Sequence, residues 1–164
     1  AGLATITAVN EFIPQPALLK WPNDLLLKGK KIAGILCEYH TIKNPAVIIG
    51  IGINVNQIQF PAGLKDIATS LKLEFGKNIN RTALIKSLIT QLDFQYNEFQ
   101  NNKVQALIDN WARNSDLFGK SITLNKGDQI INGKAIRLDN CGRLVILNNS
   151  GKEVAFDSGE VGIE

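Results

Sequence analysis

The sequence predicts an α+β fold, with a mixed β-sheet and helices followed by a small β-barrel. Apolar residues at helical spacing indicate one long helix from Asn80 to about Gln100. Earlier in the chain, two apolar runs flank a Gly-Lys turn and predict a β-hairpin. After Phe118, short apolar runs alternate with turns rich in Asn, Asp and Gly, which is typical of a small barrel. We therefore place a domain boundary near residues 117–120.

The first elements expected are a helix, a short strand and the hairpin. Apolar side chains recur every three positions over residues 1–13, and prolines follow at once, so a helix is expected there. Residues 17–21 form a short apolar strand that ends at Pro22. The hairpin pairs residues 24–28 with 31–39 across a turn around Gly29.

Residues 46–55 are nearly all apolar, and we expect a strand buried on both faces. Short helices are predicted over 67–75 and 104–111, before and after the long helix. The barrel strands are expected over residues 121–124, 129–138, 143–147 and 153–156.

Composition excludes several classes of protein. The 164 residues include 18 Lys+Arg and 15 Asp+Glu, a net charge of +3 that is spread along the chain and argues against contact with nucleic acid. No apolar run approaches the roughly 20 residues of a membrane helix. Cys37, expected in the core, and Cys141, expected as an exposed turn thiol, share no ligand-like spacing. A reducing cytoplasm fits this cysteine usage best.

A polar pair follows a rigid corner in Lys20-Trp21-Pro22-Asn23-Asp24. The corner directs the side chains of Asn23 and Asp24, while Trp21 itself is expected in the core. An Asx turn that opens the next strand explains the same residues without any function.

Lys31 begins an apolar strand seven positions after Asp24. A lysine at the mouth of such a strand could hold a phosphate as a point charge. A solvated hairpin lysine, like Lys28 and Lys30, is the alternative. Gly34 either lets another group approach the strand closely or marks a bulge.

Glycines alternate with isoleucines in Gly50-Ile51-Gly52-Ile53-Asn54-Val55-Asn56. The run lacks the third glycine and the following helix of a dinucleotide-binding loop. Period-two alternation places Gly50, Gly52 and Asn54 on one strand face, where two bare positions can accept a flat or slender ligand. The Asn54 amide could recognise an adenine edge.

Together these segments resemble the biotin protein ligases. Lys20-Trp21-Pro22-Asn23-Asp24, then Lys31-Ile32-Ala33-Gly34-Ile35-Leu36, then the Gly50–Asn56 run follow the family's order and approximate spacing. Ala68-Thr69-Ser70-Leu71 and the terminal Gly159-Glu160-Val161 are also similar to the family. The resemblance spans essentially the whole chain.

The resemblance implies a fold and its domains. The catalytic fold would be the biotin–lipoate ligase fold, similar to class II aminoacyl-tRNA synthetases, over residues 1–117. An SH3-like barrel would occupy residues 118–164. The family's Gly-Arg-Gly-Arg-type loop and its optional DNA-binding region are not in this sequence. The chain therefore resembles the C-terminal half of the catalytic domain plus the barrel, and we expect it to bind biotin only weakly by itself.

The resemblance also implies a reaction. ATP and biotin, with Mg²⁺, would form biotinyl-5′-AMP, and a lysine of a biotin carboxyl carrier protein would then take the biotin. Lys31 would act at the α-phosphate and contact the biotin carboxylate. Asp24 would orient Lys31, hold Mg²⁺ or position the incoming lysine, three roles that stay open.

The other implied site residues are amides and glycines. Asn23 and Asn54 would recognise adenine beside the Lys31 ammonium, and Gly34, Gly50 and Gly52 would wall the biotin slot. Lipoate or octanoate ligases and transferases share the fold and are one alternative. A non-catalytic binding or regulatory fragment is another, and a homodimer stays open as a partner state.

Overall fold

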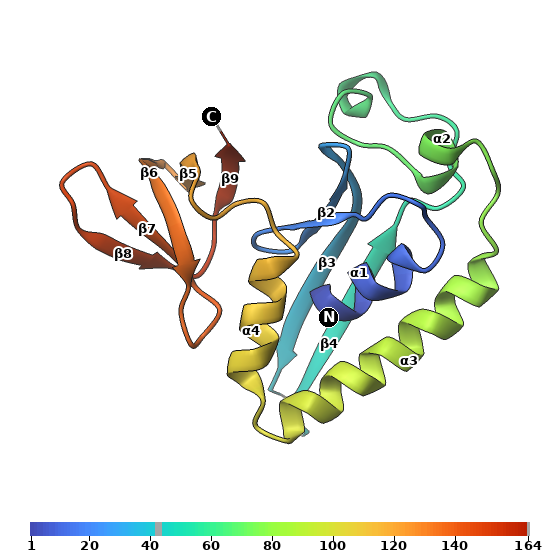
Figure 1. Ribbon diagram of the computed structural model, residues 1–164, viewed down its shortest axis with the longest axis horizontal. Helices are drawn as coiled ribbons and strands as arrows, with labels where there is room; N and C mark the ends of the chain where they lie inside the picture. Colours follow the sequence, from blue (N-terminus) through green and yellow to red (C-terminus); the bar gives the residue numbers. More distant parts are fainter. Residues whose placement is uncertain (42–43, 164) are drawn as a thin grey trace. The chain divides into compact units, whose positions relative to one another are not determined.

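A computed structural model describes residues 1–41 and 44–163, and its chain divides into two units (Figure 1). The N-terminal unit comprises residues 1–18 and 23–97. The C-terminal unit comprises residues 19–22 and 98–164. The expected domains 1–117 and 118–164 stay a prediction, because a compact unit need not be a domain that folds by itself.

The N-terminal unit begins with helix α1, Gly2–Asn10. Its apolar side chains Leu3, Ile6 and Val9 are buried, as the three-residue recurrence predicts. The helix ends before the expected residue 13, and the Asn10 Oδ1 accepts a hydrogen bond from the Ala17 N–H at 2.9 Å. That bond closes the proline-rich turn that follows the helix.

Three consecutive strands of this unit belong to one sheet: β2 (Asp24–Leu27), β3 (Lys30–His40) and β4 (Ala46–Ile53), each antiparallel to the next. The turn between β2 and β3 lies at residues 28 and 29, which both have positive φ. Leu25 and Leu27 are fully buried, whereas the alternate residues of β2 are half-buried. The predicted hairpin is therefore confirmed.

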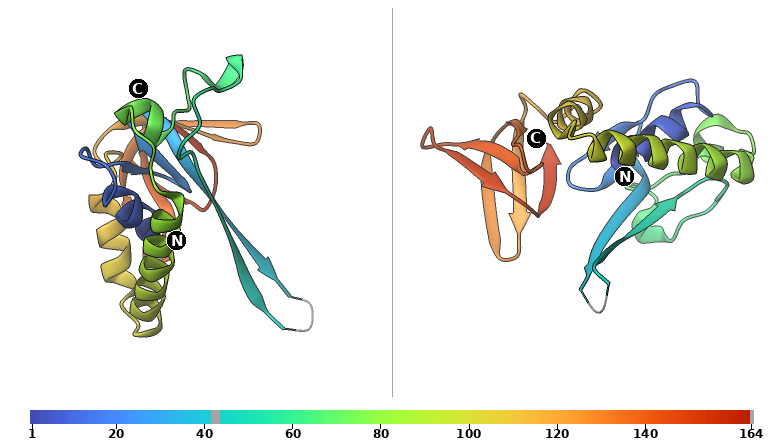
Figure 2. Two further views of the ribbon diagram at one scale, coloured as in Figure 1. Left: turned by 90° about the vertical axis from the view of Figure 1, so that its right-hand side faces the viewer. Right: turned by 90° about the horizontal axis from the view of Figure 1, so that it is seen from below.

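The outer half of the β3–β4 hairpin is exposed, which contradicts the expected two-sided burial of residues 46–55. Figure 2 shows the two strands extending together as a long ribbon. Val47, Ile48 and Ile49 are 45–59% exposed, and Cys37 is exposed rather than in the core. The reason is topological: residues 36–40 of β3 lie beyond Gly34, the last β3 residue that pairs with β2, so the outer half of the hairpin is a two-stranded ribbon. Residues 36–40 and 46–50 are exposed along it.

Helical segments follow the sheet. A 3₁₀ turn at Ala62–Leu64 precedes α2, Leu71–Phe75, whose N-cap is Ser70. The Ser70 Oγ accepts the Leu73 N–H at 3.1 Å. The long helix α3, Arg81–Gln100, begins after Asn80, whose Oδ1 accepts the Ala83 N–H at 3.1 Å. Its predicted start and end are both confirmed.

The C-terminal unit contains helix α4 and a five-stranded sheet in the order β8-β7-β6-β5-β9. The bounds are α4 Val104–Arg113, β5 Ser121–Lys126, β6 Gln129–Leu138, β7 Leu144–Asn148, β8 Glu153–Phe156 and β9 Glu160–Ile163. The first four strands agree with the sequence prediction within two residues at each end. Strand β9 was not predicted as a strand, because its four residues between a glycine and the chain end give too little periodicity.

Trp21 belongs to the core of the C-terminal unit. Strand β1, Leu18–Lys20, leads into it, and the Leu19 N–H donates to the Asn114 carbonyl at 2.7 Å. Trp21 is 4% exposed, and its Nε1–H donates to the Gly142 carbonyl at 3.3 Å. It packs in a cluster with Leu117, Ile122, Leu124, Ala135, Leu144, Ile146 and Val161. The expectation that Trp21 is a core residue is confirmed.

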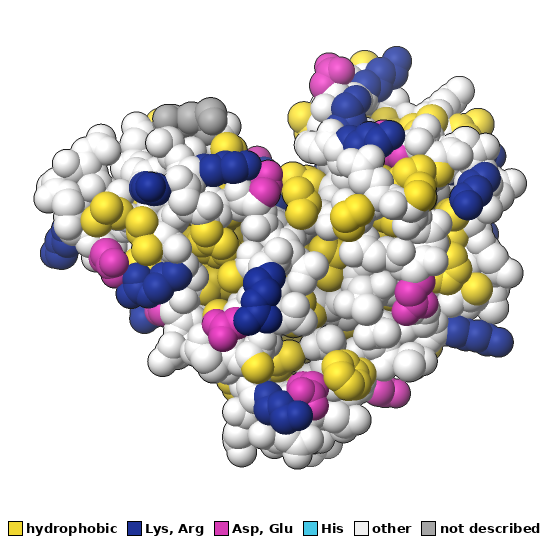
Figure 3. Space-filling model, in the orientation of Figure 1, with side chains coloured by type: hydrophobic (Ala, Val, Ile, Leu, Met, Phe, Trp, Pro, Cys, Tyr) yellow, Lys and Arg dark blue, Asp and Glu magenta, His cyan; other side chains and the backbone are white. Residues whose placement is uncertain are grey.

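Within residues 1–41 and 44–163, no helix is both long and apolar enough to cross a membrane. Lysine, arginine and acidic side chains are intermixed over the face seen in Figure 3, without one large basic patch.

Candidate functional site

One extra residue in β3 determines which side chains meet in the sheet. Asp24 pairs with Gly34 and Leu25 with Ala33, but Leu26 then pairs with Lys31, so the register shifts by one residue. In a regular strand, positions 31 and 34 would face opposite sides. The bulge returns Lys31 to the side that carries Asp24 and Gly34.

Lys31 and Asp24 form an ion pair, with Nζ 2.6 Å from Oδ1. The Lys31 side chain is 47% exposed and the Asp24 side chain is 19% exposed. The Asp24 Oδ1 atom itself is buried, and within the described residues it accepts no hydrogen bond of good geometry. Since a buried carboxylate oxygen is costly without a charged partner, the ammonium is what compensates it.

Gly34 provides the space for this pair. A Cβ at position 34 would lie 3.2 Å from the Lys31 Cε, 3.3 Å from its Nζ and 3.7 Å from the Asp24 Oδ1. The Lys31 side chain therefore lies over a bare backbone position. Any side chain at 34 would compete for the volume that the ammonium occupies.

The other two predicted glycines continue the bare surface onto β4. Gly52 pairs with Gly34, and Gly50 pairs with Leu36. A Cβ at 50 or 52 would meet no atom closer than 3.8 Å, so both positions are open. Asp24, Gly34 and Gly52 form one row across three strands, and the open strip lies beside the ion pair.

The two predicted asparagines are held by other partners. The Asn23 Nδ2 donates to the Ile35 carbonyl at 2.8 Å, and the Ile35 N–H donates back to the Asn23 carbonyl at 2.9 Å. The Asn54 Oδ1 accepts from the Gln57 Nε2 at 3.3 Å. Within the described residues, the Lys31 ammonium is thus paired with Asp24, and the hydrogen bonds of both asparagine side chains go elsewhere.

Residues 67–69, predicted from the sequence as the start of a helix over 67–75, instead pair with the start of β3. The Lys31 N–H donates to the Ile67 carbonyl at 2.8 Å, and the Thr69 N–H donates to the Lys31 carbonyl at 3.0 Å. The helix begins only at Leu71. The signal that could have placed its start is Ser70, a preferred N-cap residue, after which a helix begins.

The same stretch continues toward Asn54. The Leu71 N–H donates to the Asn54 carbonyl at 3.1 Å, and the Asn54 N–H donates to the Ile32 carbonyl at 2.7 Å. Backbone hydrogen bonds therefore join three sequence segments: the start of β3, the end of β4 and residues 67–71.

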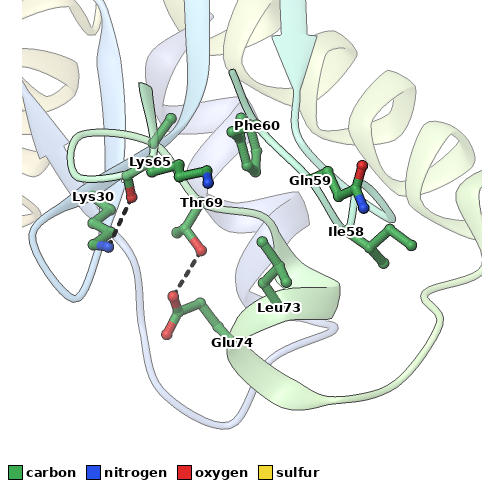
Figure 4. A pocket seen from close by; sticks show the side chains of 9 residues that line it. Lys30, Ile58, Gln59, Phe60, Lys65, Thr69, Leu73 and Glu74 are labelled. Carbon is green, nitrogen blue, oxygen red and sulfur yellow. Dashed lines mark hydrogen bonds between the residues drawn. The ribbon is translucent and has the colours of Figure 1, made fainter. Parts of the chain in front are cut away.

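A pocket of about 630 Å³ lies beside this junction (Figure 4). Its lining includes Lys30, Lys65, Phe60, Thr69 and Glu74, and none of the site residues predicted from the sequence. The Lys30 Nζ donates to the Lys65 carbonyl at 3.0 Å, and the Thr69 Oγ1 donates to the Glu74 Oε1 at 2.7 Å (Figure 4). The pocket could not be predicted from the sequence, because its walls come from segments with no shared periodicity.

Glu74 is an acidic residue of this pocket, and its neighbours lower its pKa. The hydrogen bond from Thr69 lowers the pKa of Glu74, and burial opposes that shift. The Lys28 ammonium, 3.0 Å from Oε2, lowers it further. The residues that the structure describes contain no group of three or more His, Cys, Asp or Glu side chains placed to hold a metal ion.

Comparison with known proteins gives a consistent result. Residues 2–56 match the Biotin/lipoate A/B protein ligase family, and residues 117–162 match the Biotin protein ligase C terminal domain. The chain is 34% identical over 155 residues to the bifunctional ligase/repressor BirA of Bacillus subtilis, covering 92% of this chain and 48% of that protein. It is also 34% identical over 165 residues to the biotin--[acetyl-CoA-carboxylase] ligase of Mycobacterium tuberculosis, covering 98% of this chain and 59% of that protein.

A solved structure extends the comparison to the fold. The biotin protein ligase from Aquifex aeolicus in complex with biotin and ATP is 31% identical, with a TM-score of 0.85 over 99% of this chain and 68% of that chain. The chain spans about half the length of the curated relatives that it matches. With the fold, the motifs and both family matches in agreement, the chain belongs to the biotin protein ligases.

Proposed function

We propose that the protein containing this chain activates biotin with ATP and transfers it to a lysine of a biotin carboxyl carrier protein. The observation that carries this proposal is the Lys31–Asp24 ion pair, which lies beside the bare strip at Gly34 and Gly52. Membership of the family, and the biotin and ATP in the complex of the Aquifex aeolicus relative, support it.

In the first step, a biotin carboxylate oxygen bonds to the α-phosphorus of ATP while the bond to pyrophosphate breaks. Both reactants are anions, so a fixed cation lowers the cost of bringing them together. Lys31 supplies that cation, contacting the α-phosphate and the biotin carboxylate. Asp24 holds the ammonium in place through the 2.6 Å contact.

In the second step, the amine of the carrier lysine attacks the acyl carbon of the adenylate, AMP leaves, and the amine loses a proton. No covalent intermediate with the protein is needed. Asp24 is the carboxylate available to position the incoming ammonium or accept its proton, because it lies in the same row as the glycines.

In this proposal the glycines form the surface that binds biotin, and the asparagines recognise the adenine of ATP. Gly34, Gly50 and Gly52 leave a flat strip against which the biotin rings can lie, since side chains there would occupy the same volume. Asn23, whose Nδ2 is bonded to the Ile35 carbonyl, would offer its amide oxygen to the adenine edge, and Asn54 would offer its amide. Asn54 would exchange its contact with Gln57 for the base.

Mg²⁺ would arrive with the nucleotide, and Asp24 would be the carboxylate that holds it. Mg²⁺ usually keeps several waters and takes one or two carboxylates besides substrate phosphates, so a single aspartate would fit that chemistry. The proposed location is the cytoplasm, which the two free cysteines support.

The deciding experiment compares two neighbouring lysines in the complete protein. Lys31→Ala should reduce biotin-dependent pyrophosphate release by roughly 10²-fold, as for loss of other preorganised charge donors. Lys30→Ala is the matched control and should keep near wild-type activity, because the Lys30 ammonium contacts the Lys65 carbonyl instead. Equal activity of the two variants would refute the role of Lys31.

A lipoate or octanoate ligase is the second candidate, because the family matched over residues 2–56 includes ligases for biotin and for lipoate. The match of residues 117–162 to a biotin protein ligase domain favours biotin. Incubating the complete protein with Mg-ATP and each acid in turn, then measuring the acyl-AMP by mass spectrometry, separates the two. Formation of lipoyl-AMP without biotinyl-AMP would reverse the assignment.

A further inference from the structure

We propose that Glu74, acting through Thr69, is a positioning residue for Lys31. The inference rests on the proposed role of Lys31 in the first step. A chain of contacts runs from the β2–β3 turn to the backbone of residue 31, and its members lie outside the reacting groups.

The first link is the backbone of Lys31. Its N–H donates to the Ile67 carbonyl and its carbonyl accepts the Thr69 N–H, at 2.8 and 3.0 Å. Lys31 is also the neighbour of the bulge, because the next residue, Ile32, has no partner in β2. Since the ladder to β2 is interrupted directly after Lys31, the bonds from residues 67–69 hold its peptide in place.

The second link holds Thr69 itself. Thr69 is 3% exposed, and its Oγ1 donates to the Glu74 Oε1 at 2.7 Å. The Glu74 side chain is 17% exposed, so this charge-assisted bond lies largely out of water. Figure 4 shows the two side chains directed toward each other from the loop and from α2.

The third link returns to the sheet. The second oxygen of Glu74, Oε2, lies 3.0 Å from the Nζ of Lys28, which belongs to the turn between β2 and β3. Each carboxylate oxygen of Glu74 therefore has its own partner. The contacts close a loop that runs from Lys28 through Glu74 and Thr69 to the backbone of Lys31.

Residues 67–71 also contact the segment that contains Asn54. The Ser70 Oγ donates to the Gln57 carbonyl at 2.6 Å, and the Leu71 N–H donates to the Asn54 carbonyl at 3.1 Å. A displacement of residues 67–71 would thus move both Lys31 and Asn54. A residue that touches neither substrate, such as Thr69, can therefore change the distance between the proposed phosphate-binding lysine and the proposed adenine-binding asparagine.

The test uses Thr69→Val, which removes the hydroxyl and keeps the shape and the backbone N–H. In the complete protein, the Lys31 amide should exchange with deuterium roughly five- to tenfold faster, the factor expected for loss of one hydrogen bond. The kcat of pyrophosphate release should fall by a similar factor, with a smaller change in the KM for ATP and biotin. Thr69→Ser retains the donor and should restore both quantities.

The matched control is Thr90→Val, because the Thr90 hydroxyl donates to the Lys86 carbonyl of its own helix, α3. That variant should leave the Lys31 exchange rate and kcat unchanged. Glu74→Leu is the second variant, because it removes the acceptor of the Thr69 hydroxyl, and it should reproduce the effect of Thr69→Val if the latter does not fold. A wild-type exchange rate at Lys31 in both Thr69→Val and Glu74→Leu would overturn the proposal.

The two proposals fail separately. If Lys31→Ala is fully active, the proposed role of Lys31 is wrong, whatever the exchange data show. If Lys31→Ala is inactive and Thr69→Val changes exchange but not kcat, Thr69 and Glu74 stabilise the segment without positioning the catalytic lysine, which also contradicts the inference.

Discussion

The ammonium of Lys31 lies 2.6 Å from the Oδ1 of Asp24 because β3 contains one more residue than β2 between their paired positions. Without the bulge, Lys31 would face the opposite side of the sheet from Gly34. The pair is partly exposed, and such pairs contribute little to the free energy of unfolding. The ion pair therefore matters mainly because it fixes the position of the Lys31 ammonium. Changes to its surroundings should affect activity more than the free energy of unfolding.

Gly34→Ala should displace the Lys31 side chain. The added Cβ would lie 3.2 Å from the Lys31 Cε, and the flexible lysine can move away at small cost. We expect a change in the free energy of unfolding of less than about 1 kcal/mol and a loss of pyrophosphate release of roughly tenfold. Urea unfolding and steady-state kinetics measure the two quantities.

Gly63→Ala is the control for Gly34→Ala. A Cβ there would meet no atom within 4 Å, and Gly63 belongs to the 3₁₀ turn rather than to the sheet. If both variants have equal activity, the space at Gly34 is not required for Lys31.

Gly52→Ala should affect substrate binding rather than the ion pair. Its Cβ would approach no atom of the chain more closely than 3.9 Å, so the fold accommodates it. The methyl group would project onto the strip proposed for biotin. We expect the KM for biotin to rise about tenfold or more, as for steric discrimination in a fitted pocket, while the KM for ATP changes little. An unchanged KM for biotin would place the vitamin elsewhere.

Glu74 should make stability depend on pH in the acidic range. Its pKa is lowered by the Thr69 hydroxyl and the Lys28 ammonium, with a smaller effect of Lys30. A carboxyl with a lowered pKa stabilises the fold fully above its ordinary pKa, and that contribution is lost as the pH falls through the lowered value. The wild-type protein should therefore lose more stability than Glu74→Gln on acidification.

Thermal unfolding of the wild type and Glu74→Gln at a series of pH values from neutral to acidic measures this difference. The two curves should converge at low pH, where Glu74 is protonated in both states of the wild type. If the two curves stay parallel, the charge of Glu74 does not stabilise the folded protein.

Trp21→Phe should destabilise the C-terminal unit. The variant loses the hydrogen bond from Nε1 to the Gly142 carbonyl and leaves space among fully buried side chains. We expect a loss of about 1–3 kcal/mol in the free energy of unfolding. Trp111→Phe is a suitable control because Trp111 is only partly buried against the same cluster, and its loss should be smaller. Equal losses would contradict the central place of Trp21.

Local sequence patterns determined much of this protein. The N-cap Asn80 and the apolar stripe of α3, the turn at Lys28 and Gly29, and the short strands of the C-terminal unit follow from capping, backbone conformation and alternation over neighbouring residues. The motifs around Asp24, Lys31 and Gly52 were also sufficient to indicate the family, which the comparisons show.

Tertiary structure alone decided which of these residues meet. The bulge that turns Lys31 toward Asp24, the pairing of residues 67–69 with Lys31, and the burial of Trp21 in the C-terminal unit depend on contacts between distant segments. Burial on both sides of β4 was predicted from an apolar run, yet the strand lies at an edge of the sheet. Periodicity reports which side chains share a face, whereas pairing register and neighbouring layers determine what that face contacts.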